Sequence, residues 1–143
     1  MPENISLESL EEGHYSFPGP LRDKLVAAIL SGEKTGTSSL VQQYEMDGDP
    51  LPAVGDREAI LDSDGNRVCA TETTEVTVVP FGDITLQQAL DEGEGFESIS
   101  DWQTAHRQFW ESEQFRASMG EDYRGITADT PVVYVRFKVI ARA

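Results

Sequence analysis

A lysine followed by hydroxyl-bearing residues is the part of this sequence whose residue types most directly suggest chemistry. Residues 32–39 read Gly-Glu-Lys-Thr-Gly-Thr-Ser-Ser, so Lys34 precedes Thr37, Ser38 and Ser39. An amine can activate a neighbouring hydroxyl or stabilise an oxyanion that develops on a substrate. In an extended segment Lys34 and Ser38 share one face, and a kink is needed to bring Thr37 to it. Composition alone is equally consistent with a solvated lysine beside an edge strand.

A glycine-rich acidic segment is the second candidate. Residues 92–95 read Glu-Gly-Glu-Gly. Glycines let the backbone approach a ligand closely and so place a carboxylate next to it. A carboxylate near Lys34 can act as a general base or can pair with the amine. An acidic loop in solvent is the alternative interpretation.

Several other chemistries are excluded by the residues present. The sequence has no phosphate loop, no dinucleotide-binding glycine pattern and no His-Glu-x-x-His. Two histidines and one cysteine are too few for an ordinary zinc site, so we predict no metal and no cofactor. His106 falls on a face rich in tryptophan and is predicted to be a packed, hydrogen-bonded structural residue. Cys69 is predicted to be a buried thiol in a strand.

The charge balance limits the partners. There are 26 acidic residues against 11 basic ones, a net charge of −15. A membrane surface or an extended duplex is a poor partner for such a chain, because nucleic-acid affinity depends on neutralising phosphates. A small ligand in a locally basic cleft is compatible with this charge. No apolar run approaches the roughly 18 residues of a membrane span, and residues 1–12 do not resemble a signal peptide, so we expect a cytoplasmic protein.

The elements that must position these residues follow from the hydrophobic pattern. It predicts a helix over 21–31, a short helix over 84–90 and a long helix that ends near Gly120 and begins at Ser100, which caps it in a capping box with Gln103. The predicted strands cover 36–41, 57–62, 67–79 and 131–141, with hairpin chemistry at 62–66. Strands joined by tight turns predict an α+β domain with an antiparallel, curled or barrel-like sheet. We expect residues 1–12 to be loosely ordered and 13–143 to form one domain.

An ordered set of short motifs resembles the ASCH domain family of the PUA-like class, in its longer bacterial branch. The motifs span from about residue 14 to the C-terminus, and they are residues 29–38 (ILSGEKTGTS), 51–56 (LPAVGD), 64–65, 72–76 and 92–95. This resemblance implies a small PUA-like β-barrel of mostly antiparallel strands flanked by helices. It also implies a cleft beside the first helix that binds RNA or a nucleoside.

The resemblance further implies roles for individual residues. Some small members of the family are amidohydrolases that remove an acyl group from N4-acylated cytidine, and their working residues fall on Lys34, Thr37 and Glu94, with Glu92 as the alternative carboxylate. The predicted substrate contacts are Glu92, Ser38, Ser39, Tyr44 and Arg22. The family pattern has an arginine shortly after the threonine, whereas this chain has serines there. Loss of that arginine predicts weaker phosphate recognition.

Three functions remain open at this point. The first is hydrolysis of an amide bond in a modified nucleoside. The second is an RNA-binding module or ribonuclease for short single-stranded RNA, which requires a basic stripe formed by Arg22, Lys24, Arg107, Arg116 and Arg124. The third is a ligand-sensing domain without catalysis. The oligomeric state is not predicted.

Overall fold

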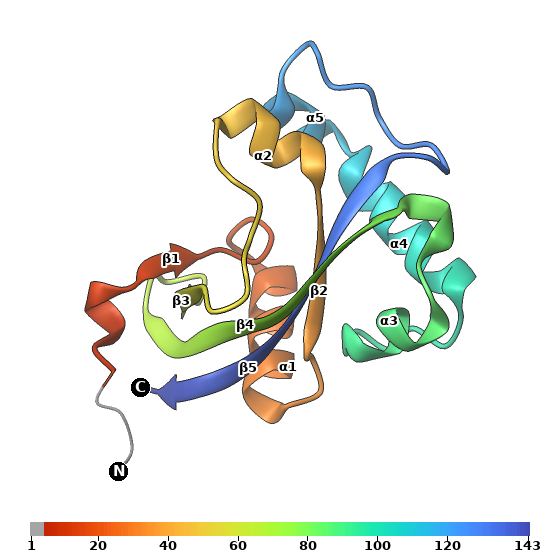
Figure 1. Ribbon diagram of the computed structural model, residues 1–143. Coiled ribbons are helices and arrows are strands. Elements are labelled where there is room, and N and C mark those ends of the chain that lie inside the picture. Colours follow the sequence, from red (N-terminus) through yellow and green to blue (C-terminus); the bar gives the residue numbers. More distant parts are fainter. Residues whose placement is uncertain (1–4) are drawn as a thin grey trace.

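A five-stranded mixed sheet forms the centre of the protein (Figure 1). The computed structural model describes residues 5–143, and residues 1–4 lie outside the described part. The strands are β1 (Glu11–Gly13), β2 (Gly36–Leu40), β3 (Arg57–Leu61), β4 (Arg67–Pro80) and β5 (Pro131–Arg142). They lie in the order β1-β3-β4-β5-β2, and among these pairs β1–β3 is parallel while the others are antiparallel.

The predicted α+β class with mostly antiparallel strands is confirmed, but the predicted barrel is not. In the described part of the chain β1 and β2 occupy the two edges and do not pair with each other, so the sheet is open. The edge strands span three and five residues, whereas β4 and β5 span 14 and 12. Such short edge strands cannot follow the twist of the long central pair far enough to meet.

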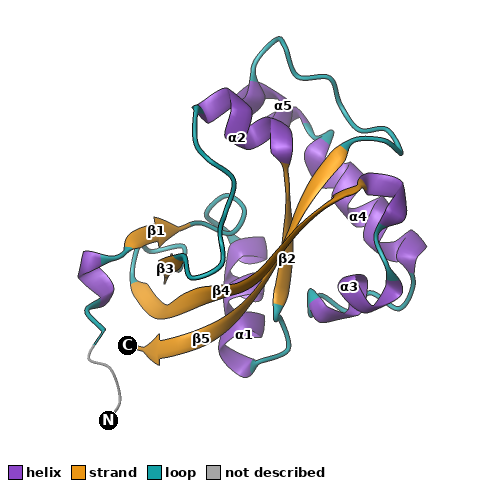
Figure 2. Ribbon diagram, in the orientation of Figure 1, coloured by secondary structure: helices purple, strands orange, loops and turns teal. Residues whose placement is uncertain are grey.

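Five α-helices accompany the sheet in residues 5–143. They are α1 (Pro20–Ser31), α2 (Val41–Asp47), α3 (Leu86–Asp91), α4 (Ile99–Trp110) and α5 (Glu113–Met119). Figure 2 shows α1 beside the sheet, α4 near the end where β4 stops and β5 begins, α5 beside α2, and α3 next to β2. No helix of the described residues is long and apolar enough to cross a membrane.

Two apolar clusters hold these elements together. The first packs α1 on the sheet through Val26 and Ile29 against Ile60, Cys69 and Phe137. The second joins α3, α4 and α5 to the other end of β5, and its largest members are Trp102, Trp110, Phe81, Phe115 and Tyr134. Strand β5 contributes to both clusters, with Phe137 in the first and Val132 and Tyr134 in the second.

The helix predicted from Ser100 to Gly120 is two helices. The cap of α4 is Ser98, whose hydroxyl accepts the amide of Asp101, so the predicted cap at Ser100 is wrong. Ser112 caps α5 in the same way and marks the break between the helices. Each serine hydroxyl satisfies an amide that has no partner within its own helix.

Other local differences have similar causes. Helix α2 was not predicted, and it begins where the Leu40 amide donates to the side chain of Gln43. Of residues 1–12, which were expected to be loosely ordered, 1–4 lie outside the described part, Leu7–Ser9 form a 3₁₀ turn, and Glu11 and Glu12 pair with β3. The buried Cys69 thiol in β4 is confirmed.

Candidate functional site

The end of α1 directs Lys34 into the protein. Gly32 has a φ of 87° and donates its amide to Ile29, and the Lys34 amide donates to Ala28, so the chain folds back over the last turn. The left-handed conformation favours glycine at this position. Thr35 then donates its amide to the carbonyl of Asp91 and accepts the amide of Phe137. These bonds fix the segment between the helix and β2.

Lys34 is buried, with an exposed fraction of 2%. Its Nζ donates to the carbonyl oxygens of Gly36 at 3.0 Å and Glu92 at 3.3 Å. The same atom lies 3.7 Å from Glu92 Oε1 and 3.6 Å from Glu94 Oε2. The interpretation of Lys34 as a solvated residue is therefore wrong. An ammonium group removed from water requires opposite charge and hydrogen-bond acceptors, and the Glu92–Glu94 segment supplies both.

Glu92 is the most enclosed member of the site, with an exposed fraction of 1%. Its Oε2 accepts hydrogen bonds from Ser38 Oγ at 2.9 Å and from the indole nitrogen of Trp102, and its Oε1 lies 3.1 Å from His106 Nε2. Burial alone would raise the pKa of Glu92, but the charges and hydrogen bonds of His106, Lys34 and Trp102 outweigh burial and lower it. Glu92 is thus an ionised carboxylate whose oxygens are already occupied.

His106 connects this carboxylate to helix α4. Its Nδ1 lies 2.9 Å from the carbonyl oxygen of Trp102, which can only accept, so Nδ1 carries a proton. Its Nε2 lies within hydrogen-bond distance of Glu92 Oε1, so both ring nitrogens face an oxygen atom. The ring stacks on Trp102 with centroids 4.2 Å apart. The prediction of a packed, hydrogen-bonded histidine is confirmed, but sequence reasoning missed its contact with Glu92.

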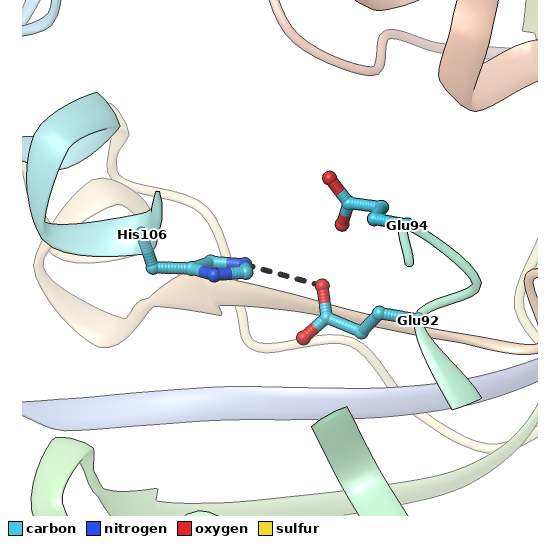
Figure 3. A group of neighbouring side chains, drawn as sticks. All are labelled: Glu92, Glu94 and His106. Atoms are coloured by element: carbon cyan, nitrogen blue, oxygen red, sulfur yellow. Dashed lines mark hydrogen bonds and ion pairs between the residues drawn. The ribbon is translucent and has the colours of Figure 1, made fainter. Parts of the chain in front are cut away.

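Glu94 lies above this group and differs from Glu92 in its access to solvent. Figure 3 shows both carboxylates reaching from one loop toward the His106 ring on the facing helix. The Glu94 side chain is 19% exposed. Burial, together with the nearby Glu92 carboxylate, raises the pKa of Glu94, although Lys34 and His106 act in the opposite direction. A reachable carboxylate with a raised pKa can exchange protons with a ligand.

Gly93 allows the two carboxylates to sit on either side of Lys34. A Cβ on Gly93 would lie 2.4 Å from the carbonyl oxygen of Glu33 and 2.6 Å from the amide nitrogen of Lys34. Its φ of 66° is also in the left-handed region. The close contact between the 92–95 turn and the Lys34 backbone therefore requires glycine.

These residues line one side of a cleft of about 1200 Å³. Thr37 also lines the cleft, and its hydroxyl makes no hydrogen bond to any of residues 5–143. Ser39 and Tyr44 line it as a hydrogen-bonded pair, with their oxygens 2.8 Å apart. The cleft thus contains a free hydroxyl, an occupied carboxylate and a reachable carboxylate around a buried ammonium group.

The structure brings most of the predicted residues to this cleft but not Arg22. The predicted residues that line it are Lys34, Thr37, Ser38, Ser39, Tyr44, Glu92 and Glu94. The buried Arg22 instead donates to the carbonyl oxygens of Tyr15 and Ser16 and supports the loop on the cleft wall. Tyr15, which lies with its ring centroid 5.9 Å from Lys34 Nζ, was not singled out from the sequence. No local sequence pattern indicates that Tyr15 lies in the site, because its contact with Lys34 forms only when the chain folds.

The ligand-type atoms of Glu92, Glu94 and His106 lie within 4.8 Å of one another, a spacing that could hold a metal ion. The ammonium of Lys34 already provides positive charge against both carboxylates. Both ring nitrogens of His106 already lie close to oxygen atoms, Nδ1 to the Trp102 carbonyl and Nε2 to Glu92 Oε1. A metal ion at this place would compete with the Lys34 ammonium group for both carboxylates.

Comparison with known proteins gives a consistent result. The family model of the ASCH domain matches residues 14–141. An ASCH domain from Lactobacillus crispatus is 27% identical with a TM-score of 0.79, over 96% of this chain and 87% of that one. The protein EF3133 from Enterococcus faecalis, of the DUF984 family, is 22% identical with a TM-score of 0.80, over 92% and 77% of the two chains. A mutant of the ZmASCH protein from Zymomonas mobilis is 14% identical, with a TM-score of 0.51 over 93% and 70%. No curated protein gives a significant match.

Replacement of Gly93 tests the close contact between the two segments. Gly95 also has a positive φ, of 87°, but a Cβ there would meet nothing within 4 Å. Gly95→Ala should lose about 1–2 kcal/mol from left-handed strain alone. Gly93→Ala should lose clearly more, because the added methyl group also pushes the turn away from Lys34. Urea unfolding of both variants measures the difference, and equal losses would contradict the proposed contact.

Replacement of Glu92 tests the compensation of the buried charge. Glu92→Gln leaves Lys34 and His106 with an uncharged partner, so we expect a loss of about 3–5 kcal/mol in the free energy of unfolding. Glu75→Gln removes an exposed partner of Arg136 and should change this free energy by less than about 1 kcal/mol. Because the pKa of Glu92 is lowered in the folded protein, its ionised carboxylate stabilises the fold fully at pH values above the ordinary glutamate pKa of about 4.3. The difference from wild type should therefore shrink as the pH falls below that value.

Proposed function

The chain belongs to the ASCH domain family, and we propose that it hydrolyses the acyl amide of a small, uncharged nucleoside such as N4-acylated cytidine. The observation that carries the proposal is the buried Lys34 ammonium between Glu92 and Glu94, in a cleft that also presents the free hydroxyl of Thr37. The set contains a potential nucleophile, a proton acceptor and a fixed positive charge. These are the three groups that acyl transfer requires.

The charge of the cleft supports an uncharged ligand. Six carboxylate side chains line it, those of Glu11, Asp49, Asp56, Glu58, Glu92 and Glu94, against the cationic side chains of Lys34 and Arg57 and two histidines. Lys34 is already neutralised by its own neighbours. A phosphate group entering this cleft would be repelled by the remaining carboxylates. The acyl amide of a neutral nucleoside carries no such penalty.

In the proposed reaction, Thr37 Oγ1 attacks the carbonyl carbon of the acyl amide while Glu94 accepts the hydroxyl proton. Two N–H groups of Lys34 donate to the carbonyl oxygens of Gly36 and Glu92, and the third N–H stabilises the oxyanion. The C–N bond then breaks as Glu94 returns the proton to the leaving amine, which releases the nucleoside. Glu94 next takes a proton from water, and the resulting hydroxide attacks the threonine ester. The bond between the acyl carbon and Thr37 Oγ1 then breaks as Glu94 returns the proton to Oγ1, and the carboxylic acid that leaves ionises in solvent.

Glu92 has a different role in this proposal. Because its oxygens already accept bonds from Ser38, Trp102 and His106, it has little capacity to accept a substrate proton. We assign it to the positioning of Lys34, and we assign proton transfer to Glu94. Glu94 is chosen over Glu92 as the proton acceptor because its side chain is more exposed to the cleft, and not because of its position in the motif.

The alternative of an RNA-binding module receives less support from the geometry. None of the five basic residues that such a stripe requires lines the cleft: Arg22, Lys24, Arg107, Arg116 and Arg124. Arg107 donates to the carbonyl of Ile126, and Arg116 donates to that of Glu111. A ligand-sensing domain without catalysis would use the same cleft, and the experiment below separates it from the hydrolase.

Substitution of the three working residues tests the proposal directly. We expect wild type to release cytidine from N4-acetylcytidine, and Thr37→Val, Glu94→Gln and Lys34→Ala each to lower kcat by at least about 100-fold. Thr104→Val, on the exposed face of α4, is the matched control and should keep the wild-type kcat. Liquid chromatography of the products measures the rates. Binding of the nucleoside without release of acetate would identify a sensing domain instead.

The pH dependence of the reaction tests the role of Glu94. A general base must be deprotonated, so its raised pKa should move the acid limb of kcat/KM above the ordinary glutamate value of about 4.3. Lys34, Glu92 and His106 face this carboxyl group and set the size of the displacement. Glu94→Asp should retain an acid limb at reduced rate. An unchanged limb in Glu94→Gln would show that another group is the base.

A further inference from the structure

Polar side chains other than Thr37 differ in their hydrogen bonds between the two sides of the cleft. Near Lys34, Ser38 and Glu92 are bonded to each other, and Ser39 is bonded to Tyr44. On the strands β3 and β4, in contrast, Glu58, Thr71 and Thr73 make no side-chain hydrogen bond to any of residues 5–143. We call these three residues the β3–β4 floor.

The two threonines of the floor are buried residues, and Glu58 is partly buried. Thr71 and Thr73 have exposed fractions of 4% and 7%, so both residues present little surface to solvent. Among residues 5–143 only Arg67 Nε is a fully buried side-chain polar atom without a partner, so the hydroxyl groups of Thr71 and Thr73 remain open to the cleft that they line. Two such groups side by side on the wall of an open cleft indicate a surface that binds the polar part of a ligand.

The positions of the three residues follow from strand register. Glu58 and Thr71 are directly paired between β3 and β4, and Thr73 lies two residues along β4. Residues two apart on a strand share a face of the sheet, so all three side chains can reach one ligand group. On the far side of β4, Thr73 pairs with Phe137 of β5, which also lines the cleft. The floor therefore lines the same cleft as Lys34, but it lies on β3 and β4, whereas Lys34 lies just before β2.

The chemistry of the floor suits hydroxyl groups. An ionised carboxylate can accept hydrogen bonds from two O–H groups, and each threonine hydroxyl can donate or accept. A carboxylate that binds ribose hydroxyls is also the device that dinucleotide-binding proteins use. Burial and the neighbouring carboxylates of Asp56 and Glu11 raise the pKa of Glu58, so this region is unfavourable for an added anion. Neutral donors fit it, and phosphate does not.

We propose that the β3–β4 floor binds the vicinal hydroxyl groups of the ligand's ribose. This inference rests on the proposed function, since the acyl amide at Lys34 fixes the orientation of the nucleoside. In cytidine the exocyclic amine and the sugar are attached at opposite sides of the ring. When the amide lies beside Lys34 and Thr37, the ribose points to the other side of the cleft, where Glu58, Thr71 and Thr73 lie.

Three substrates that differ only in the sugar test this inference. They are N4-acetylcytidine, N4-acetyl-2′-deoxycytidine and N4-acetylcytosine. We expect wild type to favour the ribonucleoside over the deoxynucleoside by about 10- to 100-fold in kcat/KM, the effect of one hydrogen bond to a charged group. Glu58→Gln and the double variant Thr71→Val, Thr73→Val should lose this preference and should hydrolyse N4-acetylcytosine as wild type does.

A matched control and a second measurement keep the test decisive. Thr74→Val, an exposed position on the same strand, should keep the preference for the ribonucleoside. Equal rates for the two nucleosides in wild type, or an unchanged preference in the floor variants, would overturn the inference while the proposed activity stands. If no substrate is hydrolysed, the proposed activity fails, and calorimetric binding of cytidine and 2′-deoxycytidine decides the floor alone. Equal affinities, or no binding of either, would overturn it.

Discussion

The burial of one ammonium group organises this structure. Lys34 lies beneath the cleft with two carbonyl oxygens and two carboxylates around its Nζ. A charge in such a place is stable only where its partners are held at fixed positions, because neither water nor a flexible side chain is available to replace them. The glycine turn after α1, the 92–95 turn and the start of β2 are therefore constrained together.

The contacts around the 92–95 turn show how that constraint is met. Asp91 accepts the amide of Thr35 through its carbonyl and pairs through its carboxylate with Arg136 of β5. Tyr134, two residues earlier on the same strand, donates its hydroxyl to the carbonyl of Gln88 in α3. Helix α3 is thus attached to the sheet at two points, and the following turn meets Lys34 in one position. Stability and the geometry of the site depend on the same bonds.

The two neighbouring glutamates illustrate how environment divides the work of similar residues. Glu92 is enclosed by Trp102, Ser38 and His106, and these donors occupy its oxygens, while His106 and Lys34 do most to lower its pKa. Glu94, two residues later, keeps access to the cleft, and burial raises its pKa. One carboxylate is therefore suited to hold charge and the other to move protons. The difference arises entirely from what packs against each side chain.

The sequence by itself determined most of the local elements, though not α2 or the break between α4 and α5, and it determined the position of the Lys34 and 92–95 motifs, because turn chemistry and hydrophobic periodicity act over a few residues. It placed the glycine stop of α1, the hairpin at 62–66 and the strand that ends the chain. Tertiary structure alone decided that the sheet stays open, that His106 reaches Glu92 and that Arg22 supports a loop instead of facing the cleft. It also gave Glu92 and Glu94 different solvent access and pKa shifts of opposite direction. These outcomes depend on contacts between residues far apart in the chain. Burial determines the charge of each side chain and its access to solvent, and a side chain becomes buried only once those contacts have formed.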